Sequence, residues 1–506
     1  MTRSPLSDYS NLGLDDPFRT AVPQRVLVIG GGPSGLITLR NLVTRGQFQT
    51  VQLVERRDDI GGNKDCELTR ERPRWPSPSY KGLIGNVLPC FLSFSGHPFP
   101  DPPNASEGQP YPTLRETQAY LKEFAEPYLK SGQIRLNTEV VRVEERIWGK
   151  GWTVVSRDWS EEGGGREVVE HWDAVVSCVF WYDHPAWPDT AGLGDLRDHG
   201  LAIHAKWWRG PELEESDLAP QRSIVIGNAN SSNDIAAQLS RVAEAPVYQS
   251  IRRTAFAGYP SLPDERIKMA SPVKRYTLKP RTGLRLNEIP TITHKFDAHL
   301  EDGTVLTDLD YVFLGTGYRP FPDFIKVFQR PEIHSAPDYS YHPQGELPEP
   351  DPPRIPHLHK LLFYAPNPSL AFTGAPATFT PFINGDVAST YIALVLSHVI
   401  PIPTSASKRL DYEQARLQLI QERQKVANNP SSLQVAYSVM AQDEEGYFAG
   451  LREEVVTVRP ELDGLLPIWG PETTQKRVAA SKIKIGALNW FKARGGGGNV
   501  QLEVLK

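Results

Sequence analysis

A strand–helix–strand pattern stands near the beginning of the chain. Residues 25–29 form a short apolar run of β-forming residues that leads directly into the glycine-rich segment at 30–35. Apolar residues then recur at helical spacing from Leu36 to Val43, Gly46 ends the repeat, and a second apolar run covers residues 50–54. This order predicts one βαβ unit, with the glycine-rich turn between its first strand and its helix.

The same pattern returns after residue 220. The sequence predicts a strand at 223–226, a turn at Gly227, a helix at 234–242 and a strand at 247–251. Elsewhere the sequence predicts helices at 114–129 and 386–396 and surface helices near 408–427 and 432–457. It predicts strands near 134–136, 139–144, 152–156, 168, 174–179 and 370–372. It also predicts a hairpin-like return from 293–300 to 310–314 and a proline-rich surface excursion at 319–356. We therefore expect an α/β chain with two nucleotide-binding units.

Composition and charge narrow the function classes. The chain has 506 residues, 39% hydrophobic and 23% charged, which is typical of a folded protein of several domains. A net charge of −5 disfavours a nucleic-acid partner, because no excess of basic residues is available for phosphates. Three cysteines favour neither a disulfide framework nor a metal site, so no metal is expected. The apolar stretch at 391–403 is too short to span a membrane, and the N-terminus has no secretory pattern, so we expect a cytoplasmic protein.

The first glycine-rich turn has the spacing G-x-G-x-x-G. Gly30 allows a tight turn, Gly32 lets a pyrophosphate approach the backbone, and Gly35 lets the helix pack closely on the strand. The free N–H groups at the helix N-terminus favour the phosphates. Glu55 lies 20 residues after Gly35, where a carboxylate accepts hydrogen bonds from ribose hydroxyls and repels a 2′-phosphate. This site therefore predicts FAD or NAD as the ligand.

The second turn is a degenerate version of the first. It keeps Gly227, but Ala229 and Ser232 replace the second and third glycines. Twenty residues after Ser232 stand Arg252 and Arg253, and cations at this place suit a 2′-phosphate. A βαβ unit that binds no nucleotide is the alternative. We interpret the pair of sites as FAD in the first and NADPH in the second.

These two cofactors define the expected domains. Residues 1–196 and 292–406 form the two parts of an FAD-binding domain, residues 197–291 form an inserted NADPH-binding domain, and residues 407–506 form a C-terminal helical extension. Further cofactor contacts are expected along the two motifs and their flanking segments, from Pro33, Ser34, Arg56, Gly62, Asn63, Asn86, Val141, Asn228, Ser231, Ser232, Asn233 and Gly317.

Several motifs together resemble the class B flavin-dependent monooxygenases, which include flavin-containing and Baeyer–Villiger monooxygenases. The resemblance covers residues from about 25 to 400. Its motifs are the first turn at 28–35, the continuation at 55–62, the segment 80–86, the linker residues Gly200, His204 and Trp208, and the late segment 313–318. It implies an enzyme in which NADPH reduces FAD, and FAD then forms a C4a-hydroperoxide that inserts one oxygen atom into a small organic substrate.

The resemblance also implies residue roles. Asn86 matches the active-site asparagine of the family, Arg252 matches the arginine at the 2′-phosphate, and the linker with His204 and Trp208 matches a hinge-like segment. Oxygenation at nitrogen or sulfur is the leading expectation. Baeyer–Villiger oxygenation of a ketone, an NADPH oxidase or reductase without oxygen transfer, and a scaffold without catalysis are the alternatives.

Four positions depart from the family pattern. Asp198 stands where an aromatic residue is expected, Asn63 and Lys64 replace a tryptophan, bulky residues occupy 178–181, and Ala229 replaces a glycine. These departures leave open a reshaped substrate cavity or a relative that no longer oxygenates.

Overall fold

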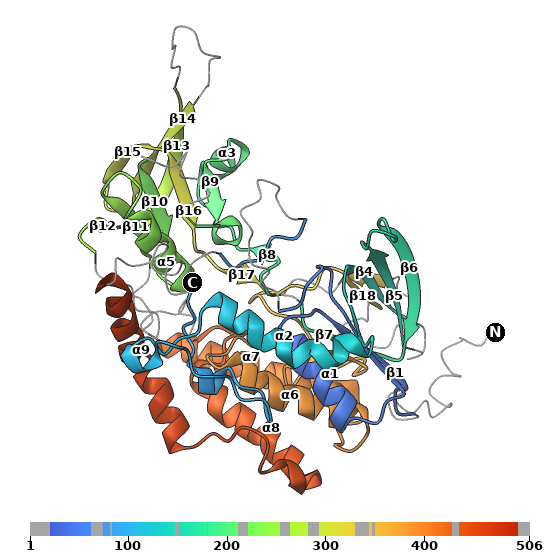
Figure 1. The fold of residues 1–506 in the computed structure, drawn as a ribbon. Helices are drawn as coiled ribbons and strands as arrows, with labels where there is room; N and C mark the ends of the chain where they lie inside the picture. Colours follow the sequence, from blue (N-terminus) through green and yellow to red (C-terminus); the bar gives the residue numbers. More distant parts are fainter. Residues whose placement is uncertain are drawn as a thin grey trace, which may run out of the picture.

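The structure is a computed structural model that describes residues 21–61, 74–80, 83–146, 151–179, 181–210, 221–252, 264–281, 293–328, 344–346, 350–427 and 435–493. Two lobes are visible in Figure 1, one with α1, α2 and α6 to α8, and the other with α5 and the strands β9 to β16. Each lobe is organised around its own sheet. The expected α/β fold with two nucleotide-binding units is confirmed.

The first sheet has seven strands in the order β20-β21-β22-β7-β1-β2-β3. At its centre, β1 pairs in parallel with β2 on one side and β7 on the other, so that Ile29 lies beside Val54 and Ser177. The strands are β1 (Arg25–Ile29), β2 (Thr50–Val54), β3 (Ile134–Arg135), β7 (Ala174–Ser177), β20 (Leu358–His359), β21 (Phe363–Tyr364) and β22 (Leu370–Phe372). Because β20 to β22 come from late in the chain, the second lobe is an insertion into the first.

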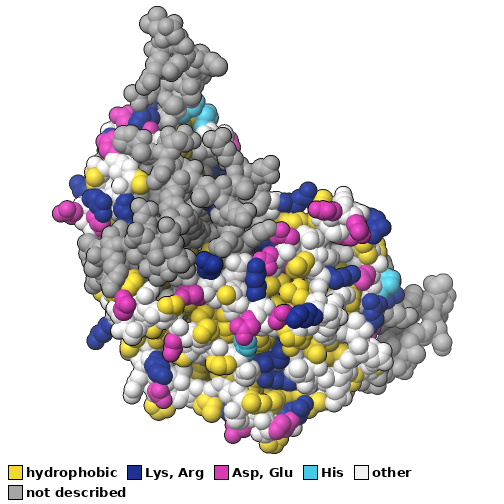
Figure 2. All heavy atoms as spheres, viewed as in Figure 1, with side chains coloured by type: hydrophobic (Ala, Val, Ile, Leu, Met, Phe, Trp, Pro, Cys, Tyr) yellow, Lys and Arg dark blue, Asp and Glu magenta, His cyan; other side chains and the backbone are white. Residues whose placement is uncertain are grey.

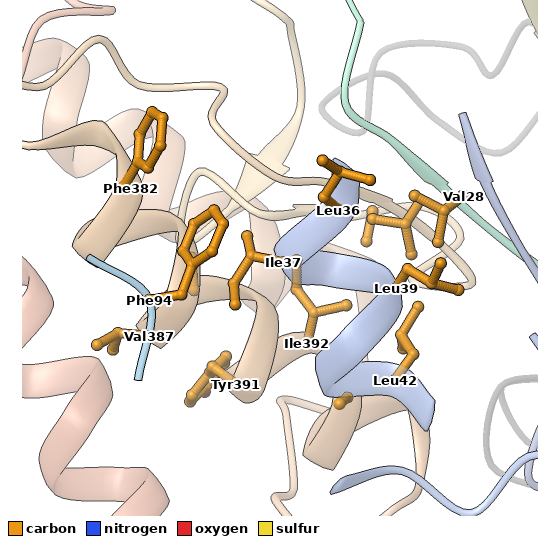
Figure 3. Packing of buried hydrophobic residues seen from close by; sticks show 14 of the residues in the cluster. Val28, Leu36, Ile37, Leu39, Leu42, Phe94, Phe382, Val387, Tyr391 and Ile392 are labelled. Carbon is orange, nitrogen blue, oxygen red and sulfur yellow. The ribbon is translucent and has the colours of Figure 1, made fainter. Parts of the chain in front are cut away.

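Three helices pack with this sheet: α1 (Pro33–Arg45), α2 (Leu114–Lys130) and α6 (Pro381–Leu396). Figure 3 shows Ile37 of α1 facing the side chains of α6, including Tyr391 and Ile392. All three of these side chains are fully buried. The apolar contact between α1 and α6 therefore holds α1 in one position, with its N-terminus at the glycine-rich turn.

The second sheet has five strands, in the order β12-β11-β10-β16-β9, and every neighbouring pair is parallel. Its strands are β9 (Ala202–His204), β10 (Ser223–Ile226), β11 (Val247–Ser250), β12 (Ile267–Ala270) and β16 (Tyr311–Leu314), and its helix is α5 (Asn230–Leu239). Strand β10 lies between β11 and β16 as β1 lies between β2 and β7. The two units thus share one local architecture.

Three smaller sheets complete the lobes. A three-stranded sheet of β13 (Val273–Arg281), β14 (Thr293–Leu300) and β15 (Val305–Leu309) packs with α3 (Leu193–Asp198) in the second lobe. A five-stranded sheet contains β19 (Gln344–Glu346), β18 (Ile325–Phe328), β4 (Thr138–Glu145), β5 (Trp152–Asp158) and β6 (Arg166–Trp172). The pair β8 (His184–Pro185) and β17 (Tyr318–Arg319) lies in the two chain segments that join the lobes.

The C-terminal part consists of α7 (Ala406–Val426), α8 (Glu444–Val458) and α9 (Pro471–Ala493). The buried Glu444 carboxylate accepts hydrogen bonds from the backbone N–H groups of Phe379 and Thr380, so α8 is tied to the start of α6. Among the described helices, none combines the length and apolar character that a membrane crossing requires. Basic and acidic side chains are interspersed on the described surface in Figure 2.

The structure differs from the sequence predictions in several elements. Helix α6 begins at Pro381, five residues before the predicted start, and α8 begins at Glu444, twelve residues after the start predicted for the helix at 432–457. Helix α5 begins at Asn230, four residues before the predicted start, because helical geometry begins at the turn and not at the first apolar residue. The hairpin return from β14 is β15, whereas β16 belongs to the parallel second sheet. The predicted domain boundary at 292 therefore falls inside the second unit. Strand β18 is buried in what was predicted as a surface excursion, and α9 was not predicted.

Candidate functional site

The first glycine-rich turn is fixed by close backbone packing. Gly30 has φ +106°, and its N–H donates to the Val54 carbonyl at 2.8 Å. A Cβ atom at Gly30 would lie 2.3 Å from Val179 Cγ1, and one at Gly35 would lie 1.7 Å from the Gly30 carbonyl oxygen. No side chain fits at either distance, so both glycines are required for the helix and the strands to meet.

Gly32 differs from these two glycines because its surroundings are open. A Cβ atom there would meet nothing within 4 Å. Gly32 is the N-cap of α1, no side chain caps the helix, and its first turn contains no acidic residue; Pro33 and Ser34 begin the helix. The helix N-terminus, with its positive end of the dipole, thus borders open space. We call the turn at 30–35 together with the N-terminus of α1 the first cradle. It fits the pyrophosphate of a dinucleotide.

The Glu55 carboxylate is held beside the turn. It is only 4% exposed, and its oxygens accept hydrogen bonds from the backbone N–H of Gly31 at 2.7 Å and of Arg57 at 3.0 Å. Glu55 directly follows β2, at the carboxyl end of the sheet. A carboxylate oxygen has several lone pairs, so this group can accept further hydrogen bonds, and its contact with ribose hydroxyls stays a prediction. The predicted contacts at Gly62 and Asn63 lie outside the described residues.

The second turn repeats the backbone of the first. Gly227 has φ +109°, and its N–H donates to the Ser250 carbonyl at 3.0 Å. The strand on the other side of each turn, β16 here and β7 in the first unit, is also placed alike. The N–H of Gly315 after β16 donates to the Ile226 carbonyl, and the N–H of Cys178 after β7 donates to the Ile29 carbonyl, both at 3.0 Å. Helix α5 likewise has no side-chain cap and no acidic residue in its first turn. This second cradle fits a nucleotide pyrophosphate in the same way.

Ser232 occupies the place of the third glycine because Gly315 leaves room for it. A Cβ atom at Gly315 would lie 2.1 Å from Ser232 Oγ. The buried hydroxyl lies 3.1 Å from the Gly315 carbonyl and 3.3 Å from that of Ile226. The Asn233 amide donates to the Asn228 carbonyl at 3.3 Å and accepts from Gln249 at 2.9 Å. The side chains of Ser232 and Asn233 therefore stabilise the turn itself.

Arg252 stands two residues after the end of β11. Because Gly227 pairs with Ser250 as Gly30 pairs with Val54, Ile251 takes the place of Glu55 and Arg252 lies one residue further along. Its side chain is exposed, whereas Glu55 is buried. Ser231 lies in the first turn of α5, and Asn228 lies in the loop before it; both are half-buried. The second predicted arginine, Arg253, lies outside the described residues. An acidic residue thus follows β2 directly, whereas a basic residue lies two positions after β11.

The predicted cofactor residue Arg56 forms an ion pair at the junction of the lobes. Its guanidinium lies 2.6 Å from Asp183 Oδ1, and the Lys206 ammonium donates to the Asp183 backbone carbonyl at 2.8 Å. Burial favours a raised pKa for Asp183, but Arg56 and Lys206 outweigh it and hold the pKa below its usual value. Sequence reasoning missed Asp183 and Lys206, because neither belongs to a motif.

The linker residues His204 and Trp208 anchor this junction. The buried His204 ring lies 3.0 Å from the Gly317 carbonyl through Nε2, and its Nδ1 accepts from the backbone N–H of Lys206 at 3.1 Å. These partners assign the neutral Nε2–H tautomer. Burial lowers the pKa of His204 to about 4, which agrees with a neutral ring. Trp208 Nε1 donates to Gln238 of α5 at 2.9 Å, which ties the linker to the second unit.

Asn86 is exposed and follows an anchored residue. The Gly85 N–H donates to the Pro112 carbonyl at 2.8 Å, so the backbone before Asn86 is fixed. Val141, a further predicted contact, is half-buried at a β-bulge of β4. Cys178 packs against the first core, and burial raises its pKa to about 12, which agrees with a structural thiol.

A polar group beside this segment was missed from the sequence. Tyr80 donates to Asp234 of α5 at 2.6 Å, and Lys484 of α9 donates to the Gly85 carbonyl at 2.9 Å. The sequence singled out Tyr80 only as part of a motif. Asp234 and Lys484 lie 154 and 404 positions after Tyr80, and no spacing in the sequence connects residues so far apart.

Comparison with known proteins places this geometry in a family. Residues 23–258 match the family described as flavin-binding monooxygenase-like. The flavin-containing monooxygenase FMO GS-OX2 of Arabidopsis thaliana is 28% identical over 399 residues, 75% of this chain and 76% of the relative. The thiol-specific monooxygenase of Saccharomyces cerevisiae is 26% identical over 390 residues, 76% of this chain and 79% of that protein.

Solved structures show the same fold. The S-allyl-L-cysteine S-oxygenase of Allium sativum superposes with a TM-score of 0.63 at 23% identity, covering 91% of this chain and 98% of that one. The open cyclohexanone monooxygenase structure has a TM-score of 0.52 at 14% identity, covering 86% of this chain and 98% of that one. These structures show the fold, and the family match and the two relatives support the enzyme class. Over residues 23–258 the chain thus matches the flavin-binding monooxygenase-like family, its fold is that of class B flavin-dependent monooxygenases, and its relatives support an oxidoreductase of the monooxygenase type.

Proposed function

We propose that this protein binds FAD in the first cradle and NADPH in the second, and that it transfers one atom of molecular oxygen to a small organic substrate. One observation carries the assignment of the cofactors. Two turns of similar backbone geometry are followed by opposite charges, the Glu55 carboxylate directly after β2 and the exposed Arg252 guanidinium two residues after β11. The carboxylate disfavours a 2′-phosphate, whereas the guanidinium favours one.

Each group of residues has a positioning role in this proposal. The first turn of α1 and Gly32 receive the pyrophosphate of FAD, and Glu55 accepts hydrogen bonds from its ribose. The first turn of α5 receives NADPH, and Ser232 and Asn233 keep that turn in shape. When bound and reduced, FAD supplies the activation of oxygen. The exposed Asn86 donates or accepts a hydrogen bond at the reaction site, on a backbone that Pro112 holds.

The contacts at the junction of the two lobes hold the two cofactor sites in a fixed relative position. The ion pair of Arg56 with Asp183 joins the residue after Glu55 to the linker between the lobes. His204 and Trp208 then fix the linker to Gly317 and to α5. These contacts orient the nicotinamide donor relative to the flavin, since a hydride moves only over a short distance.

The proposed substrate is a soft nucleophile that presents a sulfur or nitrogen atom. The name of one sequence relative supports sulfur, since it is a thiol-specific monooxygenase. The similarity to cyclohexanone monooxygenase concerns the fold, so ketone oxygenation has no separate support here.

The test compares oxygen transfer with cofactor consumption. The purified FAD-bound protein is incubated with NADPH, oxygen and a thioether, a tertiary amine or a cyclic ketone in turn. We expect one sulfoxide or amine oxide for each NADPH consumed, and NADH to be a poor donor. If hydrogen peroxide equals the NADPH consumed with all three substrates, the protein is an oxidase. If the ketone alone gives a product, the proposed substrate class is wrong.

A further inference from the structure

The C-terminal helix α9 reaches the segment in which Asn86 stands. Lys484 Nζ donates to the carbonyl oxygen of Gly85 at 2.9 Å and lies 5.0 Å from the centre of the Tyr111 ring. Trp490, two turns further along α9, lies close to Gly108, since a Cβ atom on that glycine would be 3.7 Å from Trp490 Cδ1. Figure 1 shows the dark red end of α9 near α5. Helix α9 thus contacts the loop region of the first unit on the side of the second.

The contact acts on one peptide group. The carbonyl of Gly85 and the N–H of Asn86 belong to the same planar unit and point in opposite directions. An ammonium that holds the carbonyl therefore fixes the direction of the Asn86 N–H. The other side of Gly85 is anchored as well, because its own N–H donates to the Pro112 carbonyl at 2.8 Å. Without the Lys484 contact, this peptide plane could rotate about the bonds that flank it.

Gly85 has little room for a different arrangement. A Cβ atom there would lie 3.0 Å from the Pro112 carbonyl oxygen, so the segment packs directly on the start of α2. Asn86, in contrast, is exposed, and no hydrogen bond of its side chain to another described residue is found. The backbone is held while the side chain remains available for a ligand.

The same lysine faces the second unit. Asp234 lies in α5, and its electrostatic attraction is felt by Lys484 although the two do not form a direct ion pair. Asp234 Oδ2 accepts a hydrogen bond at 2.6 Å from Tyr80, a residue of the first unit that is 3% exposed. Both residues are half-buried, and this burial lowers the pKa of Lys484 and raises that of Asp234. Charges interact more strongly at such positions than at the surface.

We propose that Lys484 is a positioning residue for the reaction: it fixes the Gly85–Asn86 peptide and, through Asp234, links this peptide to the nucleotide-binding helix α5. The inference rests on the proposed function, because it gives Asn86 a role at the reaction site. It also gives α9 a function, since this helix supplies the cation that holds the Gly85 carbonyl. The geometry requires a long cationic side chain with a donor at its end, which Arg could also provide.

The test uses three variants of the full chain with FAD bound. Lys484→Met keeps the length and apolar stem but removes the donor and the charge. Lys484→Arg keeps both. Lys482→Met is the matched control, because Lys482 lies on the same helix with an exposed side chain. Hydrogen exchange of the backbone amides at residues 83–92 is measured first, and it needs no substrate or NADPH.

We expect Lys484→Met to exchange these amides about tenfold faster than wild type, as loss of one charge-assisted hydrogen bond implies. In turnover, we expect kcat for oxygenated product to fall about tenfold, more hydrogen peroxide per NADPH, and a KM for NADPH within about threefold of wild type. Lys484→Arg should restore most of both properties, and Lys482→Met should match wild type.

Two results would overturn the inference. One is equal exchange and equal peroxide release in Lys484→Met and Lys482→Met. The other is a Lys484→Arg variant as impaired as Lys484→Met, which would indicate a packing role. Should Lys484→Met not yield folded protein, Lys484→Gln is measured against the same criteria. A wild-type protein that gives no oxygenated product contradicts the proposed function alone, since the exchange measurement still tests the contact.

Discussion

Replacing Gly32 and Gly35 in turn should separate ligand binding from folding. The two glycines are three residues apart in one turn, yet a side chain meets different surroundings at each. At Gly32 a Cβ atom contacts nothing within 4 Å, and the backbone has φ −77° and ψ 179°, which any residue adopts. At Gly35 the same atom would lie 1.7 Å from the Gly30 carbonyl oxygen, well inside van der Waals contact.

The expected magnitudes follow from these distances. Gly32→Val should change the unfolding free energy of the FAD-free protein by no more than about 0.5 kcal/mol, or stabilise it slightly because the unfolded chain loses freedom. The variant should nevertheless purify without FAD, since the side chain fills the space of the pyrophosphate. Gly35→Ala should cost about 1–3 kcal/mol or more, because α1 must move away from β1.

The assay combines flavin absorbance per protein with thermal unfolding of the FAD-free proteins. Gly32→Val should lack flavin and melt with the FAD-free wild type, whereas Gly35→Ala should melt several degrees lower. A Gly32→Val protein that purifies with one FAD per chain would refute the assignment of the first cradle. A Gly32→Val protein without FAD that melts as low as Gly35→Ala would show that Gly32 is a packing residue.

Three further predictions concern single side chains. Arg252→Ala should raise the KM for NADPH about 10- to 100-fold and leave the KM for NADH nearly unchanged in steady-state kinetics; equal changes would mean that Arg252 does not contact the 2′-phosphate. Asp386→Asn should lower the unfolding free energy by about 3–5 kcal/mol in urea titration, because Arg40 and Arg45, each 3.2 Å from the buried carboxylate, lose their counter-charge; a loss below about 1 kcal/mol would contradict this. His204 has a folded pKa of about 4, below its unfolded value, so the unfolded chain takes up the proton first and stability falls as pH decreases from about 6.5 to 4. The loss should be about 3 kcal/mol smaller in His204→Gln, and an unchanged pH profile would count against a neutral buried His204.

Local patterns gave the nucleotide units reliably. The predicted strands at 25–29, 50–54, 223–226, 293–300 and 370–372 coincide with β1, β2, β10, β14 and β22. A buried parallel strand is a short run of β-formers, and a glycine turn marks its end, so both signals lie within a few residues. Spacing within one βαβ unit also singled out Glu55 and Arg252 as candidate residues. The structure places Glu55 directly after β2 and Arg252 two residues after β11.

Pairing between distant segments could not be obtained from the sequence. The strand 311–314 follows β15 without a gap in pattern, and only the structure assigns it to the parallel sheet beside β10. The structure also explains why the second motif has a serine in place of its third glycine. Ser232 is tolerated because Gly315, 83 residues later, leaves space for its hydroxyl.

The sequence by itself determined the two βαβ units, their opposite terminal charges and the resemblance to a flavin-dependent monooxygenase. These features depend on residues that are neighbours along the chain, where sterics and hydrogen bonding act over a few positions. The tertiary structure alone decided that Arg56 pairs with Asp183, that Tyr80 pairs with Asp234, and that Lys484 contacts the residue before Asn86. Contacts of this kind join segments up to 399 residues apart, and they form only when the cores of both lobes and the C-terminal helices have packed.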